Sequence, residues 1–111
     1  MHIDKETTED ATTWKLQGTL DVFSVGYLRA AFASAGEPEV LVLDLTALDT
    51  IEPVAIGALR QGLREQTAKG TRVALCGGSK DVRRVLHLVG IAHNFPMLSS
   101  TAEARTADAK V

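Results

Sequence analysis

The side chain best suited to covalent chemistry is Cys76, which is followed by Gly77, Gly78 and Ser79. Ser79 is a typical first residue of a helix, so the thiol is predicted to lie where a strand ends and a helix begins. A thiol beside a helix N-terminus can be acidified and act as a nucleophile or carry a phosphoryl group. No basic residue is placed in the sequence to activate Cys76, and a small buried core thiol is the interpretation that we favour.

Other features of the sequence that could bind a ligand are weaker. Gly77-Gly78 could cradle a phosphate on backbone N–H groups, but a pair of glycines is not a phosphate-binding motif. His2, His87 and His93 have no metal-ligand spacing, and a single Cys excludes an internal disulfide and a Cys-based zinc cluster. We therefore expect neither a metal site nor a cofactor.

A second group of candidate residues comes from Glu52-Pro53-Val54 and the residues after it. Pro53 is suited to the first position of a helix, where its missing N–H would have no partner in any case. The Glu52 carboxylate could complement the helix dipole or contact a partner. Val54 would favour an interface if it is exposed at the first turn. Ile56 could belong to the same surface or point into the core.

Two nearby turns add further candidates. Asp21 could contact a partner or a nucleotide, or it could cap a following helix, and by residue type alone we prefer the cap. Thr19 and Thr50 are the nearest hydroxyls that could accept a phosphoryl group.

These candidates are positioned by a strand and a helix in the middle of the chain. The four apolar residues 40–43 show no alternation, which indicates a strand buried on both faces. The helix from Pro53 carries Ile56, Leu59 and Leu63 on one side and Arg60 on the other, and Gly70 is placed to end it.

The rest of the chain alternates strands with helices, which predicts an α/β domain with a largely parallel sheet. The alternation of residues 12–18 indicates a strand near an edge, and Ile3 could belong to a short strand paired with it. The other expected elements are a helix containing Val25, Leu28 and Phe32, a strand over 72–76, a helix over 79–90, a short strand over 95–98 and a terminal helix from Thr101.

Composition narrows the function. A chain of 111 residues fits one domain, 1–111, with 45% hydrophobic and 23% charged residues. A net charge of −2 and dispersed basic residues give no reason to expect nucleic acid. The polar, acidic N-terminus is unlike a secretory signal, and no apolar run reaches the length of roughly 20 residues that spans a bilayer. We expect a soluble cytoplasmic domain without membrane insertion.

Three ordered segments resemble the STAS domain, which sulfate transporters and bacterial anti-sigma-factor antagonists share. Gly18-Thr19-Leu20-Asp21 looks like the family's G-x-L-D. Val42-Leu43-Asp44-Leu45 through Ile51 resembles the strand and turn that lead to the regulatory helix. The segment 85–91, VLHLVGI, is similar to a third family motif, so the resemblance is strongest over 18–91, with 101–111 as a possible terminal helix.

The resemblance implies a mixed, mostly parallel sheet of four to five strands with helices packed around it. It also implies a non-enzymatic bacterial module for signal transduction and transcription regulation, which binds an anti-sigma factor/serine kinase or a related signalling protein. A subunit of a lipid-transport ATPase complex is the alternative partner role, and an enzyme or phosphocarrier using Cys76 is another. The expected partner-binding residues are Asp21, Glu52, Pro53, Val54, Ile56 and Arg60.

One departure from the family pattern concerns its control. The antagonists carry Asp-Ser-Ser/Thr-Gly before the regulatory helix, and a partner kinase phosphorylates the first Ser. The corresponding residues here are Glu52-Pro53-Val54-Ala55, and neither Pro53 nor Val54 has a hydroxyl. The resemblance therefore implies a binding module that is not phosphorylated at Pro53.

Overall fold

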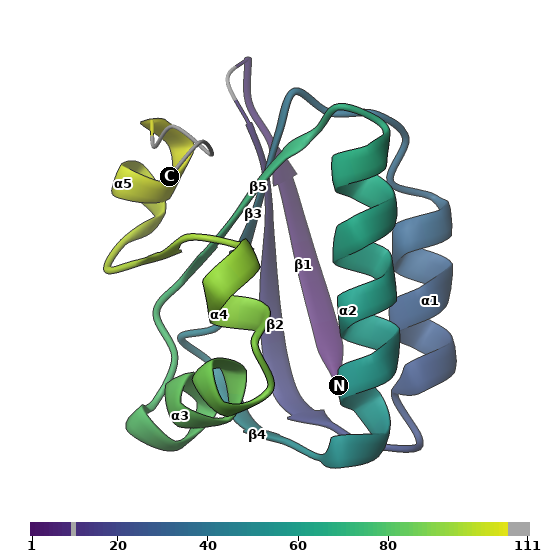
Figure 1. Cartoon of the computed structure of the whole chain (residues 1–111). Coiled ribbons are helices and arrows are strands. Elements are labelled where there is room, and N and C mark those ends of the chain that lie inside the picture. The colour runs from purple at the N-terminus through teal and green to yellow at the C-terminus, as the bar shows by residue number, and fades with distance from the viewer. Residues whose placement is uncertain (10, 107–111) are drawn as a thin grey trace.

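The computed structural model describes residues 1–9 and 11–106, which form one α/β domain of alternating strands and helices (Figure 1). The strands are β1 (His2–Thr7), β2 (Thr12–Leu20), β3 (Val40–Asp44), β4 (Leu48–Ile51), β5 (Arg72–Cys76) and β6 (Met97–Leu98). The helices are α1 (Val25–Ala33), α2 (Pro53–Ala68), α3 (Lys80–Leu88), α4 (Ile91–Asn94) and α5 (Thr101–Thr106).

The strands form a mixed sheet in the order β1-β2-β3-β5-β6, with β4 paired to the end of β2. Among the strands of the described residues, only β1 runs antiparallel to its neighbour; the pairs β2–β3, β2–β4, β3–β5 and β5–β6 are parallel. The predicted α/β class and mostly parallel sheet are confirmed. Within residues 1–9 and 11–106 the sheet has six strands instead of the four to five expected, because β4 occupies a segment whose sequence predicts a turn.

The central strand β3 explains the unbroken apolar run in the sequence. Residues 40–43 are all buried, and their side chains divide between two apolar clusters. Leu41 and Leu43 join Trp14 in the larger cluster, to which α1 and α2 also contribute. Val40 and Val42 lie in the smaller cluster, together with Ala104 of α5. Both faces of β3 are therefore covered, as a strand in an α/β domain requires.

Helices α1 and α2 lie side by side on one face of the sheet (Figure 1). Phe32 of α1 packs against Trp14 of β2 with ring centroids 5.0 Å apart. Its ring also covers Gly62 of α2, so closely that a Cβ atom at that position would lie 2.2 Å from the ring. The two helices thus approach each other through a glycine that leaves room for the Phe32 ring.

Several element ends follow the sequence prediction and others do not. Gly70 (φ 95°) and Gly90 (φ 85°) adopt the left-handed conformation expected after helices. The expected strand over 95–98 is reduced to β6, because Phe95 is the C-terminal cap residue of the short helix α4 and its N–H donates to the Ile91 carbonyl oxygen. The terminal helix begins at Thr101, where Ser100 rather than Thr101 accepts a hydrogen bond from the helix backbone. Residues 107–111 of the expected terminal helix lie outside the described residues.

None of the helices within the described residues is both long and apolar enough to cross a membrane.

Candidate functional site

The candidate site is built where β2 and β4 end beside each other. Leu20 pairs with Ile51 at the ends of these parallel strands. The Glu52 backbone N–H then donates to the Leu20 carbonyl oxygen, with an N···O distance of 2.8 Å. The chain leaves β2 into the loop 21–24 and leaves β4 into α2, so the loop and the start of α2 are neighbours. The sequence predicted both turns, and the structure brings them together.

Helix α2 begins as its sequence predicts. Glu52 is extended (φ −88°, ψ 149°) and Pro53 occupies the first helical position. The Glu52 carbonyl oxygen accepts the first helical hydrogen bond, from the Ala55 N–H at 2.9 Å. The Glu52 carboxylate makes no capping bond and is exposed, so it adds negative charge to the surface at the positive end of the helix dipole.

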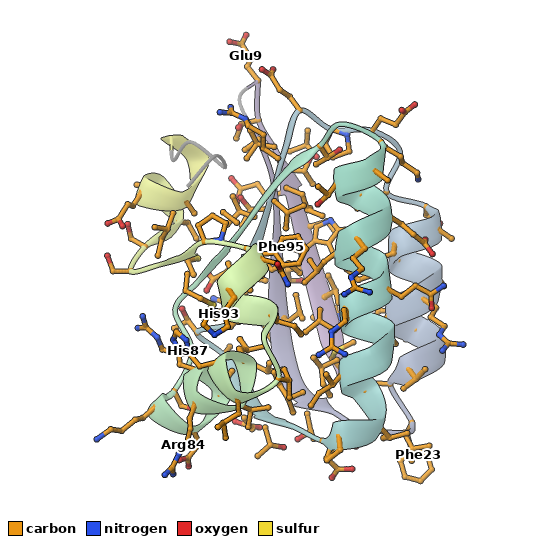
Figure 2. The ribbon with its side chains drawn as sticks, in the orientation of Figure 1. Glu9, Phe23, Arg84, His87, His93 and Phe95 are labelled. Carbon is orange, nitrogen blue, oxygen red and sulfur yellow. The ribbon has the colours of Figure 1, made fainter. Side chains whose placement is uncertain are left out.

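Apolar side chains are concentrated at this end of the molecule. The exposed large hydrophobic side chains of the described residues are Val22 (57%), Phe23 (92%), Tyr27 (45%), Val54 (54%) and Leu88 (78%). Val22, Phe23 and Val54 belong to the two neighbouring turns, and Pro53, which precedes Val54, is exposed as well. We call Val22, Phe23, Pro53 and Val54 the apolar corner. Figure 2 shows Phe23 pointing away from the rest of the protein at this end.

Asp21 holds the backbone of the loop that carries Phe23. Its Oδ1 accepts hydrogen bonds from the backbone N–H groups of Phe23 (3.0 Å) and Ser24 (3.1 Å). The buried Ser24 hydroxyl accepts from the Asp21 N–H at 2.7 Å and lies within 3.2 Å of the Thr19 carbonyl oxygen. Asp21 therefore caps the turn 21–24 and not the helix itself, because the N-cap residue of α1 is Ser24, whose side chain makes no capping bond. The half-buried Asp21 carboxylate stiffens the loop.

Two of the predicted partner-binding residues occupy different surroundings from the corner. Ile56 is 9% exposed and belongs to the large core cluster, which matches the core alternative rather than an exposed contact. Arg60 is half-buried, and its guanidinium donates to the Val89 carbonyl oxygen at the end of α3. The structure thus places Arg60 as a tie between α2 and α3, one that satisfies a helix-terminal carbonyl.

The two candidate hydroxyls lie beside each other. Thr19 and Thr50 are paired residues of β2 and β4. Thr50 is exposed and Thr19 is half-buried, so Thr50 has the more accessible hydroxyl of the two.

Cys76 has the environment of a core thiol. Its side chain is 1% exposed and lies in the smaller apolar cluster. Burial, with a smaller contribution from the neighbouring Asp44 carboxylate, raises the pKa of Cys76 from 9.0 to about 11. A nucleophilic cysteine needs the opposite shift, because the thiolate is the reactive form. The geometry therefore argues against covalent chemistry at Cys76.

The Gly77-Gly78 step has a structural explanation. Both glycines have positive φ (69° and 94°), and a Cβ atom on Gly77 would lie 2.3 Å from the Thr46 hydroxyl oxygen. The Ser79 hydroxyl caps α3 by accepting from the Val82 N–H at 3.1 Å, as predicted. These glycines are needed for the turn and its packing, so they give no independent sign of a phosphate site.

The described residues contain no cluster of three or more His, Cys, Asp or Glu side chains that could hold a metal ion. His87 and His93 are exposed on α3 and α4, on the outside of the molecule (Figure 2).

Sequence reasoning missed Val22 and Phe23, which carry much of the exposed apolar surface at the corner. The signal was present: two large apolar residues lie between Asp21 and Ser24, outside the helical pattern of Val25, Leu28 and Phe32. A Phe in a turn that no amphipathic pattern accounts for is a candidate for an exposed contact.

Comparisons with known proteins agree with this fold. The family model for the STAS domain matches residues 2–104. A crystal structure of an anti-sigma factor antagonist from Mycobacterium paratuberculosis has a TM-score of 0.84 at 21% identity, covering 95% of this chain and 91% of its own. A putative anti-sigma factor antagonist from Thermotoga maritima has a TM-score of 0.82 at 18% identity, with coverages of 92% and 90%.

The STAS domain of a SulP transporter from Vibrio cholerae is also similar, with a TM-score of 0.73 at 17% identity and coverages of 91% and 82%. No curated protein sequence matches the chain. The structural likeness, at these identities, concerns the fold, and the family model covers nearly the whole sequence. The chain therefore belongs to the STAS domain family.

Proposed function

We propose that this chain, as a single domain over 1–111, is a protein–protein interaction module that docks a signalling partner through the apolar corner. The observation that carries the proposal is the exposure of Phe23, Val22 and Val54 on two adjoining turns. Apolar side chains clustered on the surface of a domain mark interaction sites more often than scattered ones do. Aromatic residues at the centre of such sites often contribute most of the binding free energy.

The proposed partner is an anti-sigma factor/serine kinase or a related signalling protein. Solved structures similar to this chain include anti-sigma factor antagonists, which supports this partner class. A STAS subunit of a lipid-transport ATPase complex would use the same corner, so the two roles differ in the partner and not in the surface. The Cys76 alternative is not supported, because a buried thiol with a raised pKa is poorly nucleophilic.

We further propose that docking is not interrupted by phosphorylation at the start of α2. A phosphoryl group brings nearly two negative charges, which would add to the Glu52 carboxylate and make burial at an interface costly. Pro53 and Val54 cannot carry that group, and both are exposed at the first turn of α2. A partner surface facing them therefore meets the same uncharged, apolar side chains at all times.

Charging the corner tests this function. We expect Val54→Asp to abolish capture of a partner from the native cytoplasm, because a buried unpaired carboxylate opposes binding strongly. Val54 is 54% exposed, so the fold should be unaffected. Leu88→Asp is the matched control, since Leu88 is 78% exposed on α3, outside the corner. A partner retained equally by the native chain, Val54→Asp and Leu88→Asp would reject the proposed surface.

A further inference from the structure

We propose that the partner presents an apolar pocket for Phe23, surrounded by Lys and Arg side chains. This inference rests on the proposed docking function and specifies the chemistry of the surface that fits the corner. Phe23 acts as the central anchor in this account, and the corner's own carboxylates form the complementary rim.

The first step concerns Phe23 itself. Its side chain is 92% exposed, the highest value among the exposed large hydrophobic residues that the structure describes. Its backbone is nevertheless held, because the Asp21 carboxylate accepts hydrogen bonds from the N–H groups of Phe23 and Ser24. A large aromatic side chain on a stiff loop loses little conformational entropy on binding, which favours its role as an anchor.

The second step concerns charge. Between Lys15 and Arg29, and again between Arg29 and Arg60, the sequence has no Lys or Arg. The loop after β2 and the whole segment from β3 to the second turn of α2 are therefore free of basic residues. Arg60 itself is engaged with the Val89 carbonyl oxygen.

Carboxylates do occur in these segments and lie close to the apolar corner in the chain. Glu52 precedes Pro53 directly, Asp21 precedes Val22, and Asp49 is exposed on β4, three residues before Glu52. Asp21 is half-buried, while Glu52 is exposed. In the chain, the charged residues next to the apolar corner are therefore carboxylates, with Asp49 and Glu52 exposed, and they favour a basic partner surface.

The same charges argue against a second copy of this chain as the occupant. A two-fold dimer through the corner would place like carboxylates opposite each other, because such an interface pairs the same patch with itself. Facing like charges are repulsive, and a partner of opposite charge is attracted at a distance as well as in contact. We therefore assign the corner to a different protein with a basic rim.

Two synthetic peptides test the inference directly. Both are amphipathic with the same Leu-rich face; one has Lys and Arg beside that face, and the other has Glu at the same positions. Each is titrated into the ¹⁵N-labelled full chain, and amide shifts give the site and the dissociation constant. We expect the basic peptide to shift residues 21–27 and 50–57 and to bind at least about tenfold more tightly than the acidic one.

Phe23→Ser and Leu88→Ser provide the matched pair of variants. Both side chains are highly exposed, so neither substitution should disturb the fold. Phe23→Ser should lower the affinity for the basic peptide by about 30-fold, the size typical of a lost anchor residue. Leu88→Ser should leave that affinity unchanged. The affinity for the native chain should also fall as salt is raised, because the rim charges are exposed.

Several outcomes would overturn the inference. These are equal binding of the two peptides, no binding of the basic peptide, shifts away from the corner, or an unchanged affinity in Phe23→Ser. A second copy of this chain is the remaining candidate for the corner, and sedimentation of the native chain tests it. Self-association that Phe23→Ser abolishes would assign the corner to a second copy. If Val54→Asp loses its partner while the peptides bind equally, the docking function stands and the basic rim of the partner is rejected.

Discussion

At the scale of single residues, Asp21 and Phe23 have different parts in the same surface. Phe23 offers apolar area, and Asp21 fixes the backbone that presents it, through hydrogen bonds of 3.0 and 3.1 Å. The sequence predicted Asp21 as a helix cap from its residue type, but its carboxylate caps the turn 21–24 while Ser24 is the N-cap residue of α1. The sequence could not reveal that Phe23 is exposed, because exposure depends on the long-range contacts of the loop.

Cys76 allows a prediction about reactivity. With a pKa of about 11, only about one thiol in 10,000 is ionised at pH 7, and the side chain is buried. We expect the folded protein to resist a thiol-specific reagent such as a disulfide dye, and the urea-unfolded protein to react rapidly. Fast labelling of the folded chain would contradict the assignment of Cys76 as a core residue and would revive its role as a nucleophile.

The same raised pKa has a consequence for stability at high pH. The folded state favours the neutral thiol, so Cys76 ionises more readily in the unfolded chain. The stabilisation of the folded state by the neutral Cys76 thiol is fully present below pH 9. It is lost as the pH rises toward about 11, and the free energy of unfolding then falls by up to about 1.4 kcal/mol per pH unit. The free energy of unfolding of the native chain is compared with that of Cys76→Ala at each pH in this range. The difference isolates the effect of Cys76 ionisation, because the cavity left by the substitution does not depend on pH.

At the scale of the elements, α2 packs the core and also begins the proposed docking surface. Ala55, Ile56, Leu59 and Leu63 are buried, while Pro53, Val54 and Gly57 are exposed. The apolar periodicity of its sequence predicted the helix, while Pro53 marked its start and Gly70 its end. The division of Pro53, Val54 and Ile56 between the surface and the core needed the structure, because all three are apolar and lie within one turn.

Two glycines in α2 provide a matched test of its packing. Gly62 lies under the Phe32 ring, whose nearest atom would be 2.2 Å from a Cβ, while a Cβ on Gly57 would meet nothing within 4 Å. We expect Gly62→Ala to lower the free energy of unfolding by about 1–2 kcal/mol through overpacking. Gly57→Ala should raise it by about 0.5–1 kcal/mol, because alanine favours the helix.

Urea unfolding of both variants measures these changes. Equal effects in the two variants would mean that Phe32 does not pack on Gly62 as the structure describes.

Strand β4 shows where sequence patterns were insufficient. Leu48-Asp49-Thr50-Ile51 has two polar residues at its centre and only four residues in all, so its local pattern is that of a turn. Its strand conformation depends on parallel pairing with Gly18–Leu20, a contact between distant segments. This pairing matters for the site, since it brings the loop carrying Phe23 beside the start of α2.

At the scale of the whole molecule, the fold separates the core from the corner. The sheet is packed by α1 and α2 on one face, and α5 contributes to the smaller cluster on the other. The corner lies at the ends of β2 and β4, a common position for binding sites in α/β folds. The alternating strands and helices predicted this architecture, whereas the antiparallel edge β1, with a single buried apolar residue, Ile3, gave only a weak signal.

The central claim is that the corner docks its partner permanently, and an affinity measurement with and without ATP tests it most directly. The partner captured through the Val54-dependent surface is purified, and its dissociation constant for the native chain is measured before and after incubation with ATP, with intact mass recorded. We predict an unchanged dissociation constant and no phosphate on residues 52–56, while Pro53→Ser, which restores a hydroxyl, gains mass and loses affinity. A native chain that becomes phosphorylated near the corner, at Thr50 for example, and releases its partner would contradict the account.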